Sequence, residues 1–360
     1  MSAWQTASNI LAVRLDNIGD VILLSPALRA IKLARPETRL TLLASRAGAT
    51  AAPLLPWVDD VIVWRAVWQD LGHLAFEPAR EMELIELLRE RRFDAAFHFT
   101  SFSQTPHVAG YVSYLAGIPL RAGSSKEFGG AVLTHELRCH DDAIHQAERN
   151  LQLVETVGYP VSDRSLTVEI PEHARALARS ILGLAGVDLS RPYIIVHPGA
   201  SAAARRYPAD RFAEIVALLA AGGIQVLVTG SERESELVWA VSESTDAATP
   251  LVGQTTLPEY AATVADAAAV VCNDSLPLHL ADAVGTPVVA LFAGTDLESQ
   301  WQPRSTPATL LRRPTACAPC YRFECPIGQP CLDIEPRTVV DAVMRLLSEP
   351  STRRREAAQR

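Results

Sequence analysis

Short, uninterrupted apolar runs that alternate with amphipathic helical segments constrain the fold of this chain more than any other feature. Residues 193–196 and 269–272 are such runs, and residues 10–15 form a similar short apolar run that contains one charged residue, Arg14. They lack the polar alternation of half-exposed strands, which is typical of parallel strands buried on both faces. Because helical segments follow these runs, the pattern predicts an α/β fold of βαβ units, with helices on both faces of each parallel sheet.

The same patterns give a provisional order of elements. In the first half we expect strands at 10–15, 41–44, 61–64 and 95–99 and helices at 21–33, 78–92 and 145–157. In the second half we expect strands at 193–196, 225–229, 269–272 and 287–292 and helices at 209–221, 232–241 and 277–284.

The chain length predicts two hydrophobic cores. Its 360 residues exceed what one core usually organises. Residues 158–192, rich in Pro, Ser and charges, are the natural place for a boundary. We therefore predict doubly wound domains at 1–165 and 180–345 that face a central cleft. Ligands of such sheets bind beyond the carboxyl ends of the strands, so the loops there are the candidate sites.

The composition narrows the class of partner. The chain carries 41 acidic and 33 basic residues, a formal charge of −8, and no long basic block, which argues against nucleic acid. The N-terminal MSAWQTAS has no positive charge, and Arg14 and Asp16 interrupt the apolar run that follows. This pattern fits neither a signal peptide nor a membrane span, so we expect a cytoplasmic protein.

The first candidate loop, residues 16–20, joins a predicted strand to a predicted helix. Gly19 permits a close backbone approach or a strained turn. Asp20 fits two roles. Aspartate is a common helix N-cap, and the spacing alone favours that structural role. A carboxylate at this place is also suited to accept a proton from an attacking hydroxyl group.

The second candidate loop, residues 197–201, follows another buried strand. Gly199 and Ala200 are small residues that expose backbone N–H groups, Ser201 adds a hydroxyl, and Arg205 lies within reach. This combination is suited to a diphosphate, although an ordinary surface loop is the alternative.

Two further loops carry polar residues at strand ends. Asp274 and Ser275 lie where a helix start favours an anion, and either residue also fits a simple helix cap. Glu232 and Glu234 end another strand, where a carboxylate would bind ribose hydroxyls, but glutamates at helix starts are common.

Several of these segments together resemble one known family. They are RLDNIGDVILLSPAL at 14–28, HPGAS at 197–201, RRYP at 205–208, and ND at 273–274 with His279. In this order and spacing they look like glycosyltransferase family 9, the heptosyltransferases, over nearly the whole chain. Separated motifs in order are stronger evidence than any single motif.

The resemblance implies a GT-B fold of two Rossmann-like domains, with the acceptor bound by the N-terminal domain and the nucleotide sugar by the C-terminal one. It implies an inverting transfer from a donor such as ADP-heptose. Asp20 matches the proposed general base, and Arg205 matches a basic residue that contacts the donor phosphates. Asp274 matches an aspartate that places the donor, Ser275 a hydroxyl position and His279 the late histidine. The chain departs from the pattern at Leu276, where most relatives have glycine.

The chemistry suggested by the residues needs no metal and no cofactor. No Asp-x-Asp triplet occurs in the chain, so a divalent-metal clamp on a diphosphate has no obvious ligands. Cys317, Cys320, Cys325 and Cys331 have a first pair spaced as in zinc sites. Similar Cys-rich ends occur in the family without implying a metal, so we rank reduced thiols or a local disulfide above zinc.

The expected partners are a nucleotide-sugar donor and a glycan or lipid-linked acceptor. In much of the family the acceptor is the inner core of lipopolysaccharide, which implies peripheral contact with the cytosolic face of the inner membrane. Other acceptors, including secondary metabolites, and other nucleotide sugars are alternatives. No feature indicates an obligate protein partner.

Two other classes share parts of this pattern. An oxidoreductase would need a G-x-G-x-x-G turn after the first strand, and the chain has none there. A non-catalytic nucleotide-sugar binding protein would keep the donor loops but have no use for Asp20.

Overall fold

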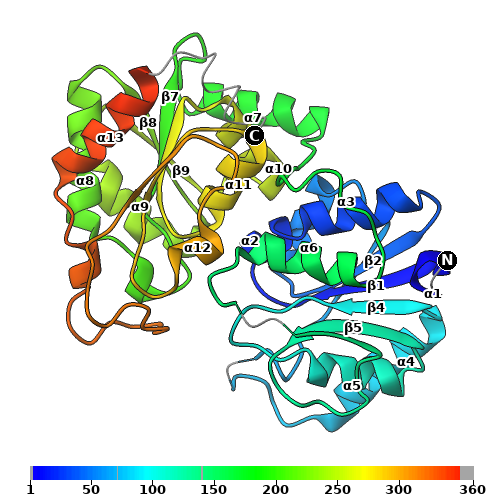
Figure 1. The fold of residues 1–360 in the computed structure, drawn as a ribbon. Coiled ribbons are helices and arrows are strands. Elements are labelled where there is room, and N and C mark those ends of the chain that lie inside the picture. Colours follow the sequence, from blue (N-terminus) through cyan, green and yellow to red (C-terminus); the bar gives the residue numbers. More distant parts are fainter. Residues whose placement is uncertain (1–2, 71, 139–140, 349–360) are drawn as a thin grey trace. The chain divides into compact units, whose positions relative to one another are not determined.

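The computed structural model describes residues 3–70, 72–138 and 141–348. The chain divides into two compact units, residues 1–169 and 170–360. Each unit is built around one parallel sheet (Figure 1).

The first unit has the strand order β3-β2-β1-β4-β5-β6, with all neighbours parallel. Its strands are β1 (Asn9–Arg14), β2 (Arg39–Ala44), β3 (Asp60–Val63), β4 (Ala95–His98), β5 (Leu120–Ser125) and β6 (His135–Arg138). Its helices are α1 (Ala3–Thr6), α2 (Ile18–Ile22), α3 (Ser25–Ala34), the 3-10 helix η1 (Gly48–Leu54), α4 (Pro78–Arg91), α5 (His107–Leu115) and α6 (Gln146–Thr156).

The second unit repeats this order, β12-β11-β10-β7-β8-β9, again parallel throughout. Its strands are β7 (Tyr193–His197), β8 (Gln225–Gly230), β9 (Ala248–Val252), β10 (Ala269–Asn273), β11 (Val288–Leu291) and β12 (Ala308–Leu311). Its helices are α7 (Glu172–Leu184), η2 (Ala203–Arg205), α8 (Ala209–Ala221), η3 (Glu232–Glu234), α9 (Ser235–Ser242), α10 (Leu257–Asp266), α11 (Leu276–Val284), α12 (Glu298–Trp301), η4 (Pro330–Leu332) and α13 (Pro336–Ser348).

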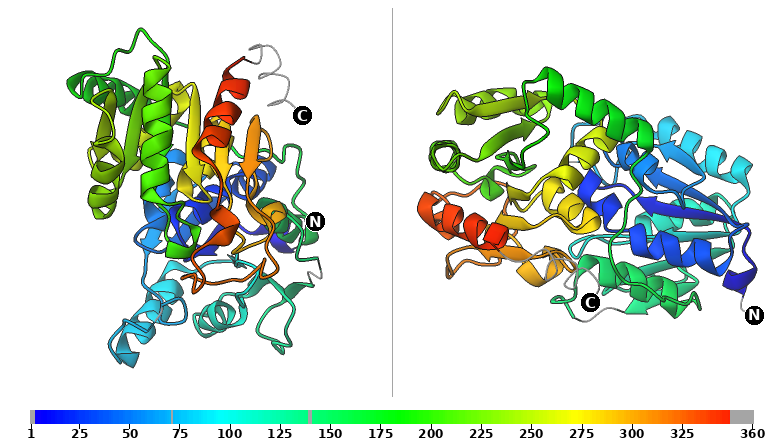
Figure 2. Two further views of the ribbon diagram at one scale, coloured as in Figure 1. Left: turned by 90° about the vertical axis from the view of Figure 1, so that its left-hand side faces the viewer. Right: turned by 90° about the horizontal axis from the view of Figure 1, so that it is seen from above.

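Helices cover both faces of each sheet, as the apolar strands require. In the first unit, α3 and α6 lie on one face and α4 and α5 on the other (Figure 1). Leu11 and Val13 of β1 join a buried cluster with Leu84 and Leu88 of α4. In the second unit, α8 and α13 cover one face of the sheet (Figure 2), and their apolar side chains pack against β7, β8 and β10. The predicted α/β architecture is confirmed.

The structure corrects several expected elements. The helix expected at 21–33 is two helices, α2 and α3, because Pro26 lies in the first turn of α3 and cannot donate the hydrogen bond that a continuous helix needs. The boundary segment 158–192 contains the helix α7. Edge strands such as β6 and β12 were missed because their residues are partly exposed and lack an apolar run.

The strand order places the candidate loops. It reverses direction between β1 and β4 in the first unit and between β7 and β10 in the second. Loops at the carboxyl ends of the strands on either side of such a point diverge and leave room for a ligand. The segments 15–20 and 99–106 flank this point in the first unit, and 198–202 and 274–275 flank it in the second.

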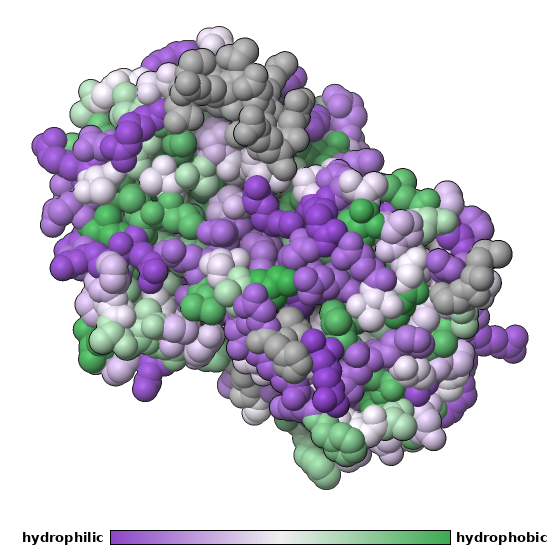
Figure 3. Space-filling view, viewed as in Figure 1, coloured by the Kyte–Doolittle hydropathy of each residue, from purple (hydrophilic) through white to green (hydrophobic). Residues whose placement is uncertain are grey.

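Polar and apolar residues are interspersed on the surface drawn in Figure 3. Across residues 3–70, 72–138 and 141–348, none of the helices has the length and apolar character that a membrane span requires.

Candidate active site

The end of β1 carries a buried arginine between two carboxylates. The Arg14 side chain is fully buried. Its Nε lies 2.9 Å from Asp16 Oδ2, and its terminal nitrogen Nη2 donates to Asp20 Oδ1 at 2.7 Å. The same nitrogen donates to Ser101 Oγ at 2.8 Å. Burial alone would lower the pKa of Arg14, but the two carboxylates outweigh it and raise that pKa, so the guanidinium is charged.

Asp20 does not have the position that its spacing suggested. Helix α2 begins at Ile18, its N-cap is Asn17, and Asp20 is the third helical residue. The expectation that Asp20 is the N-cap is therefore wrong. Its Oδ2 accepts a hydrogen bond from the Asn17 N–H at 3.1 Å, so it completes the helix start from inside the first turn. Gly19 is buried in the same turn without a left-handed backbone, so the strained turn considered for it is absent from this described segment.

Asp16 joins three strand ends at the same edge of the sheet. Its Oδ1 accepts hydrogen bonds from Gln69 Nε2 at 2.7 Å and from Gln104 Nε2 at 2.6 Å. Gln69 follows β3 and Gln104 follows β4. Burial raises the pKa of Asp16, while Arg14 opposes this shift. Neither glutamine was predicted, because the neutral amides lie 53 and 88 residues from Asp16 in sequence.

In the second unit, Gly199 in the loop after β7 lies in close contact with the side chain of Glu234. A Cβ atom added at Gly199 would lie 1.9 Å from Glu234 Oε1, so glycine is required for this close approach. Ser231 holds the other oxygen of Glu234 through its N–H at 2.9 Å and its hydroxyl at 2.7 Å. Burial would raise the pKa of Glu234, but His197 and the Ser231 hydrogen bonds hold it below its usual range.

The two predicted glutamates lie in different surroundings. Glu234 points to the loop that contains Gly199, whereas Glu232 lies against Gly253, where an added Cβ atom would be 2.6 Å from Glu232 Oε2. The structure therefore brings only Glu234 to the predicted phosphate loop.

Arg205 lies among acidic residues of the neighbouring loops. Its Nη2 donates to Asp296 Oδ2 at 2.6 Å, and its Nε donates to Thr295 Oγ1 at 3.2 Å. Its Nη1 is 3.9 Å from Asp274 Oδ2, and Asp274 is buried. Thr295 and Asp296 were not predicted, although they follow β11 at the carboxyl edge where the same rule directs the search.

Asn273 ties the predicted donor loops together. It is fully buried at the end of β10. Its Oδ1 accepts from the Tyr207 N–H at 3.0 Å, and its Nδ2 donates to the carbonyl oxygens of Pro198 at 2.8 Å and Gly199 at 3.3 Å. One amide at the end of β10 thus holds two parts of the segment after β7, which lie 66 to 75 residues away in sequence.

Helix α11 presents its start at the same edge. Ser275 is its N-cap, and Leu276 is its first residue. Leu276 does not have a left-handed backbone, so the leucine in place of the family glycine causes no backbone strain. His279 belongs to α11, and its side chain is buried. The centroid of its ring lies 6.3 Å from the centroid of the Trp301 ring.

The remaining predicted loop residues differ in exposure. Ser201 is exposed, whereas Ala200 is buried. The Ala200 carbonyl accepts a hydrogen bond from Arg206 Nε at 2.8 Å, so Arg206 stabilises the loop at residues 197–201.

The Cys-rich segment packs beside these loops. Cys317, Cys320, Cys325 and Cys331 are free thiols. The Cys320 N–H donates to the Gly294 carbonyl at 3.0 Å, and the Phe323 carbonyl accepts from the Ala204 N–H at 2.9 Å. In the part of the chain that the structure describes, no group of three or more His, Cys, Asp or Glu side chains could hold a metal.

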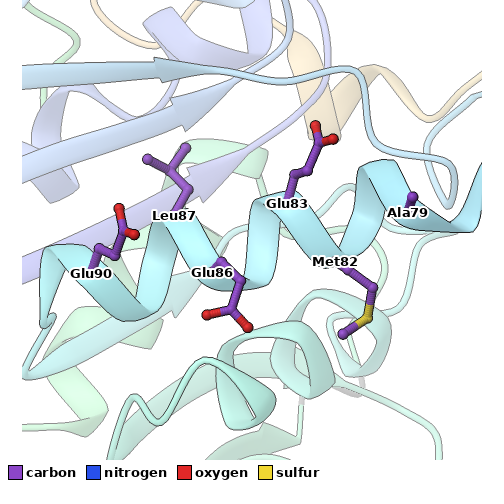
Figure 4. Close-up of a pocket in the computed structure, with 6 residues that line it drawn as sticks. All are labelled: Ala79, Met82, Glu83, Glu86, Leu87 and Glu90. Carbon is purple, nitrogen blue, oxygen red and sulfur yellow. The ribbon is translucent and has the colours of Figure 1, made fainter.

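A shallow hollow of about 510 Å³ lies elsewhere, on helix α4 (Figure 4). Its lining comes from α4 alone, with Glu83, Leu87 and Glu90 pointing to one side of the helix and Met82 and Glu86 to the other. None of the predicted site residues lines it.

The fold and the loops define a class of protein. Two Rossmann-like units, each with polar residues at the strand-order reversal, form the α/β fold of GT-B glycosyltransferases. The model of glycosyltransferase family 9 (heptosyltransferase) matches residues 82–330, and the chain belongs to this family. It is a glycosyltransferase.

Individual relatives agree with this assignment. The chain is 27% identical to lipopolysaccharide heptosyltransferase 2 of Salmonella typhimurium, over 94% of this chain and 99% of the relative. Its fold is similar to that of a family 9 glycosyltransferase from Veillonella parvula, with a TM-score of 0.77 and 22% identity over 95% of this chain and 98% of the other. It is also similar to E. coli ADP-heptose lps heptosyltransferase II, with a TM-score of 0.74 and 23% identity over 94% and 98%.

Proposed function

We propose that this chain is an inverting glycosyltransferase that transfers heptose from ADP-heptose to a hydroxyl group of the lipopolysaccharide inner core. Asp20 is the general base, and the loops of the second unit bind the donor. The Salmonella typhimurium relative is a lipopolysaccharide heptosyltransferase, which supports the acceptor, and the E. coli structure is that of an ADP-heptose lps heptosyltransferase, which supports both the acceptor and the donor.

The observation that carries the proposal is the position of Asp20. Its carboxylate lies at the carboxyl edge of the sheet, beside the strand-order reversal, and is held through both oxygens by Arg14 and the Asn17 N–H. A base must be fixed within hydrogen-bond reach of the proton that it removes.

The transfer is a single displacement. The acceptor hydroxyl oxygen attacks the anomeric carbon, its proton passes to Asp20, and the bond from that carbon to the β-phosphate oxygen breaks. ADP leaves with the electron pair. Because attack and departure occur on opposite faces of the carbon, the configuration inverts.

The leaving diphosphate gains negative charge, which the donor loops are suited to stabilise. Arg205 supplies a cation, and residues 199–201 and the start of α11 supply N–H donors. We propose that this arrangement acts without a metal, which agrees with the lack of an Asp-x-Asp triplet in the sequence. Addition of EDTA to the transfer assay tests this, and lost activity that Mg²⁺ restores would contradict it.

We propose further that Glu234 holds the ribose hydroxyls and that Asp274, Ser275 and His279 place the donor sugar. Glu234 supports this role because its carboxylate lies beside the loop of Gly199. The acceptor is then bound by the first unit, at the cytosolic face of the inner membrane where its lipid is anchored.

A panel of nucleotides tests the donor. We expect ADP and ADP-heptose to raise the melting temperature, because a ligand at 100 times its Kd adds about 2.7 kcal/mol of stability. UDP, GDP and CDP should act weakly. Stabilisation by one of these instead would keep the transferase and change the donor, and a response to NAD alone would contradict the proposed function.

Asp20→Asn tests the base. The variant should lose about 10²-fold or more in kcat but keep its Kd for ADP. Glu37→Gln, at a carboxylate of the same unit that is 65% exposed, is the matched control and should transfer normally. If the wild-type chain binds ADP-heptose but transfers to no acceptor, it is a binding protein.

A further inference from the structure

The network around Arg14 holds more negative than positive charge. One guanidinium contacts two carboxylates, Asp16 at 2.9 Å and Asp20 at 2.7 Å. The side chains of Asp16 and Asp20 are 10% and 14% exposed, so water screens their charges poorly. Asp16 is not needed to neutralise Arg14, because Asp20 alone would do so.

The Asp16 carboxylate is surrounded by donor groups and one cation. Gln69 and Gln104 donate to Oδ1, and Arg14 faces Oδ2. The Asp16 main-chain carbonyl accepts from Ser45 Oγ at 2.7 Å, which fixes the loop itself. A site that offers only donors is built for the ionised carboxylate.

The other side chains that hydrogen-bond to this network are neutral. His98 of β4 lines the same cavity of about 20 Å³ as Asp16, and burial, with a smaller effect of Arg121, lowers its pKa to about 3. Ser101 and Gln104 from the loop after β4 and Gln69 from the loop after β3 hydrogen-bond to the network, and Thr100 and Thr105 line the same cavity as Asp16. From η1, Gly48 faces the apolar Val21 of α2. Arg14, Asp16 and Asp20 are therefore the charged groups in direct contact, and a further buried cation, Arg149, lies over the ring of Phe102 next to Ser101.

This balance matters for a base. A carboxylate that has an arginine to itself binds a proton weakly, because an adjacent cation lowers a carboxyl pKa by about 1–3 units. A second carboxylate on the same arginine opposes that effect through like-charge repulsion. We propose that Asp16 is a positioning residue for the transfer reaction: it shares the Arg14 guanidinium with Asp20, so that Arg14 only partly neutralises the Asp20 carboxylate that receives the acceptor proton.

This inference rests on the proposed role of Asp20 as the base. Asp16 acts through Arg14, since Gln69 and Gln104 donate to its Oδ1 and its Oδ2 forms an ion pair with Arg14. A merely structural Asp16 would fasten the loop and leave the pH dependence of the reaction unchanged. The pH profile of kcat therefore separates the two roles.

The experiment measures kcat and the donor KM of Asp16→Asn between pH 4.5 and 9, the range in which an enzymatic base is usually titrated. Without the Asp16 charge, Arg14 interacts with Asp20 alone. We expect the acidic limb of the profile to move about one unit lower, and the plateau of kcat to fall about tenfold because the base is weaker. The donor KM should change less than about twofold, since the loops proposed to bind the donor belong to the second unit.

Asp70→Asn is the matched control. Asp70 is next to Gln69 in the same loop, and its carboxylate pairs with Arg65 instead of Arg14. It removes one charge from the same region, so the acidic limb should keep its position.

Gln69→Lys covers the case in which Asp16→Asn does not fold. Gln69 is partly exposed, so the longer side chain is accommodated, and the added cation cancels the excess negative charge while Asp16 stays in place. The acidic limb should again move lower. An unmoved limb in every variant that folds overturns the inference, even if the melting temperature falls. Full activity of Asp20→Asn would instead overturn the proposed function.

Discussion

The carboxylate of Glu234 packs directly on the backbone of Gly199, where a Cβ atom would stand 1.9 Å from Oε1. Two hydrogen bonds from Ser231 anchor the other oxygen, so Glu234 cannot move aside without losing them. The contact joins the end of β7 to the end of β8.

Gly199→Ala should therefore displace Glu234. We expect about a tenfold weaker Kd for ADP, measured by calorimetry, and a loss of about 1–2 kcal/mol in the free energy of unfolding, because the charged hydrogen bonds are broken. Gly183→Ala, at a helical site with nothing within 4 Å of the added atom, is the control and should be neutral or slightly stabilising. Normal ADP binding by Gly199→Ala would contradict the proposed role of Glu234 in donor binding.

Asp296→Asn should tighten the binding of ADP. In the structure Asp296 holds Arg205 at 2.6 Å, so a diphosphate must compete for the guanidinium and lie near a carboxylate. Removing that charge should lower the Kd for ADP about two- to fivefold, the equivalent of a partly exposed ion pair, whereas Arg205→Ala should raise it.

The control for this comparison is Asp333→Asn, at a carboxylate that pairs with Arg211 and Arg313. It should leave the Kd for ADP unchanged. Weaker binding by Asp296→Asn would mean that Asp296 contacts the donor itself.

His98 should make stability fall at acid pH. Burial lowers its pKa to about 3, whereas an unfolded histidine titrates near 6.5. Between these values the unfolded chain binds the extra proton, so stability decreases as pH falls, by at most about 1.4 kcal/mol per pH unit from this group. Urea unfolding of His98→Leu between pH 6.5 and 4 should show a shallower slope than the wild-type chain.

The exposed His73 of the same unit supplies the comparison. His73→Gln should keep the wild-type slope. Equal slopes for His98→Leu and the wild type would show that His98 is not the group responsible.

Asn273→Ala should weaken both the fold and donor binding. It leaves the Tyr207 N–H and the Pro198 carbonyl without their partner, which should cost about 2–4 kcal/mol of unfolding free energy for the buried groups. The Kd for ADP should rise because the loops lose their common anchor. Thr286→Val, which removes one buried hydrogen bond at the opposite edge of the sheet, should lower stability by about 1 kcal/mol and leave the Kd unchanged.

Much of the fold was predictable because its central strands carry an unambiguous signal. The runs at 193–196 and 269–272 became β7 and β10, and the strand expected at 95–99 became β4. These strands are buried on both faces, so their side chains are mostly apolar, and the polar His98, His197 and Asn273 stand at their carboxyl ends. A strand at the edge of a sheet has a neighbouring strand on one side only. The edge strand β6 is accordingly partly exposed, and its sequence, HELR, is as polar as that of a loop.

The candidate site was likewise only partly predictable from the sequence. The sequence by itself determined which loops follow the buried strands, and so identified Asp20, Gly199, Arg205 and Asp274, because strand ends and small residues are local signals. Only the tertiary structure decided which side chains meet: Gln104 with Asp16, Asp296 with Arg205, and Asn273 with Tyr207. Those pairs lie 66 to 91 residues apart, and parallel strands bring their loops to one edge without leaving any periodic trace in the sequence.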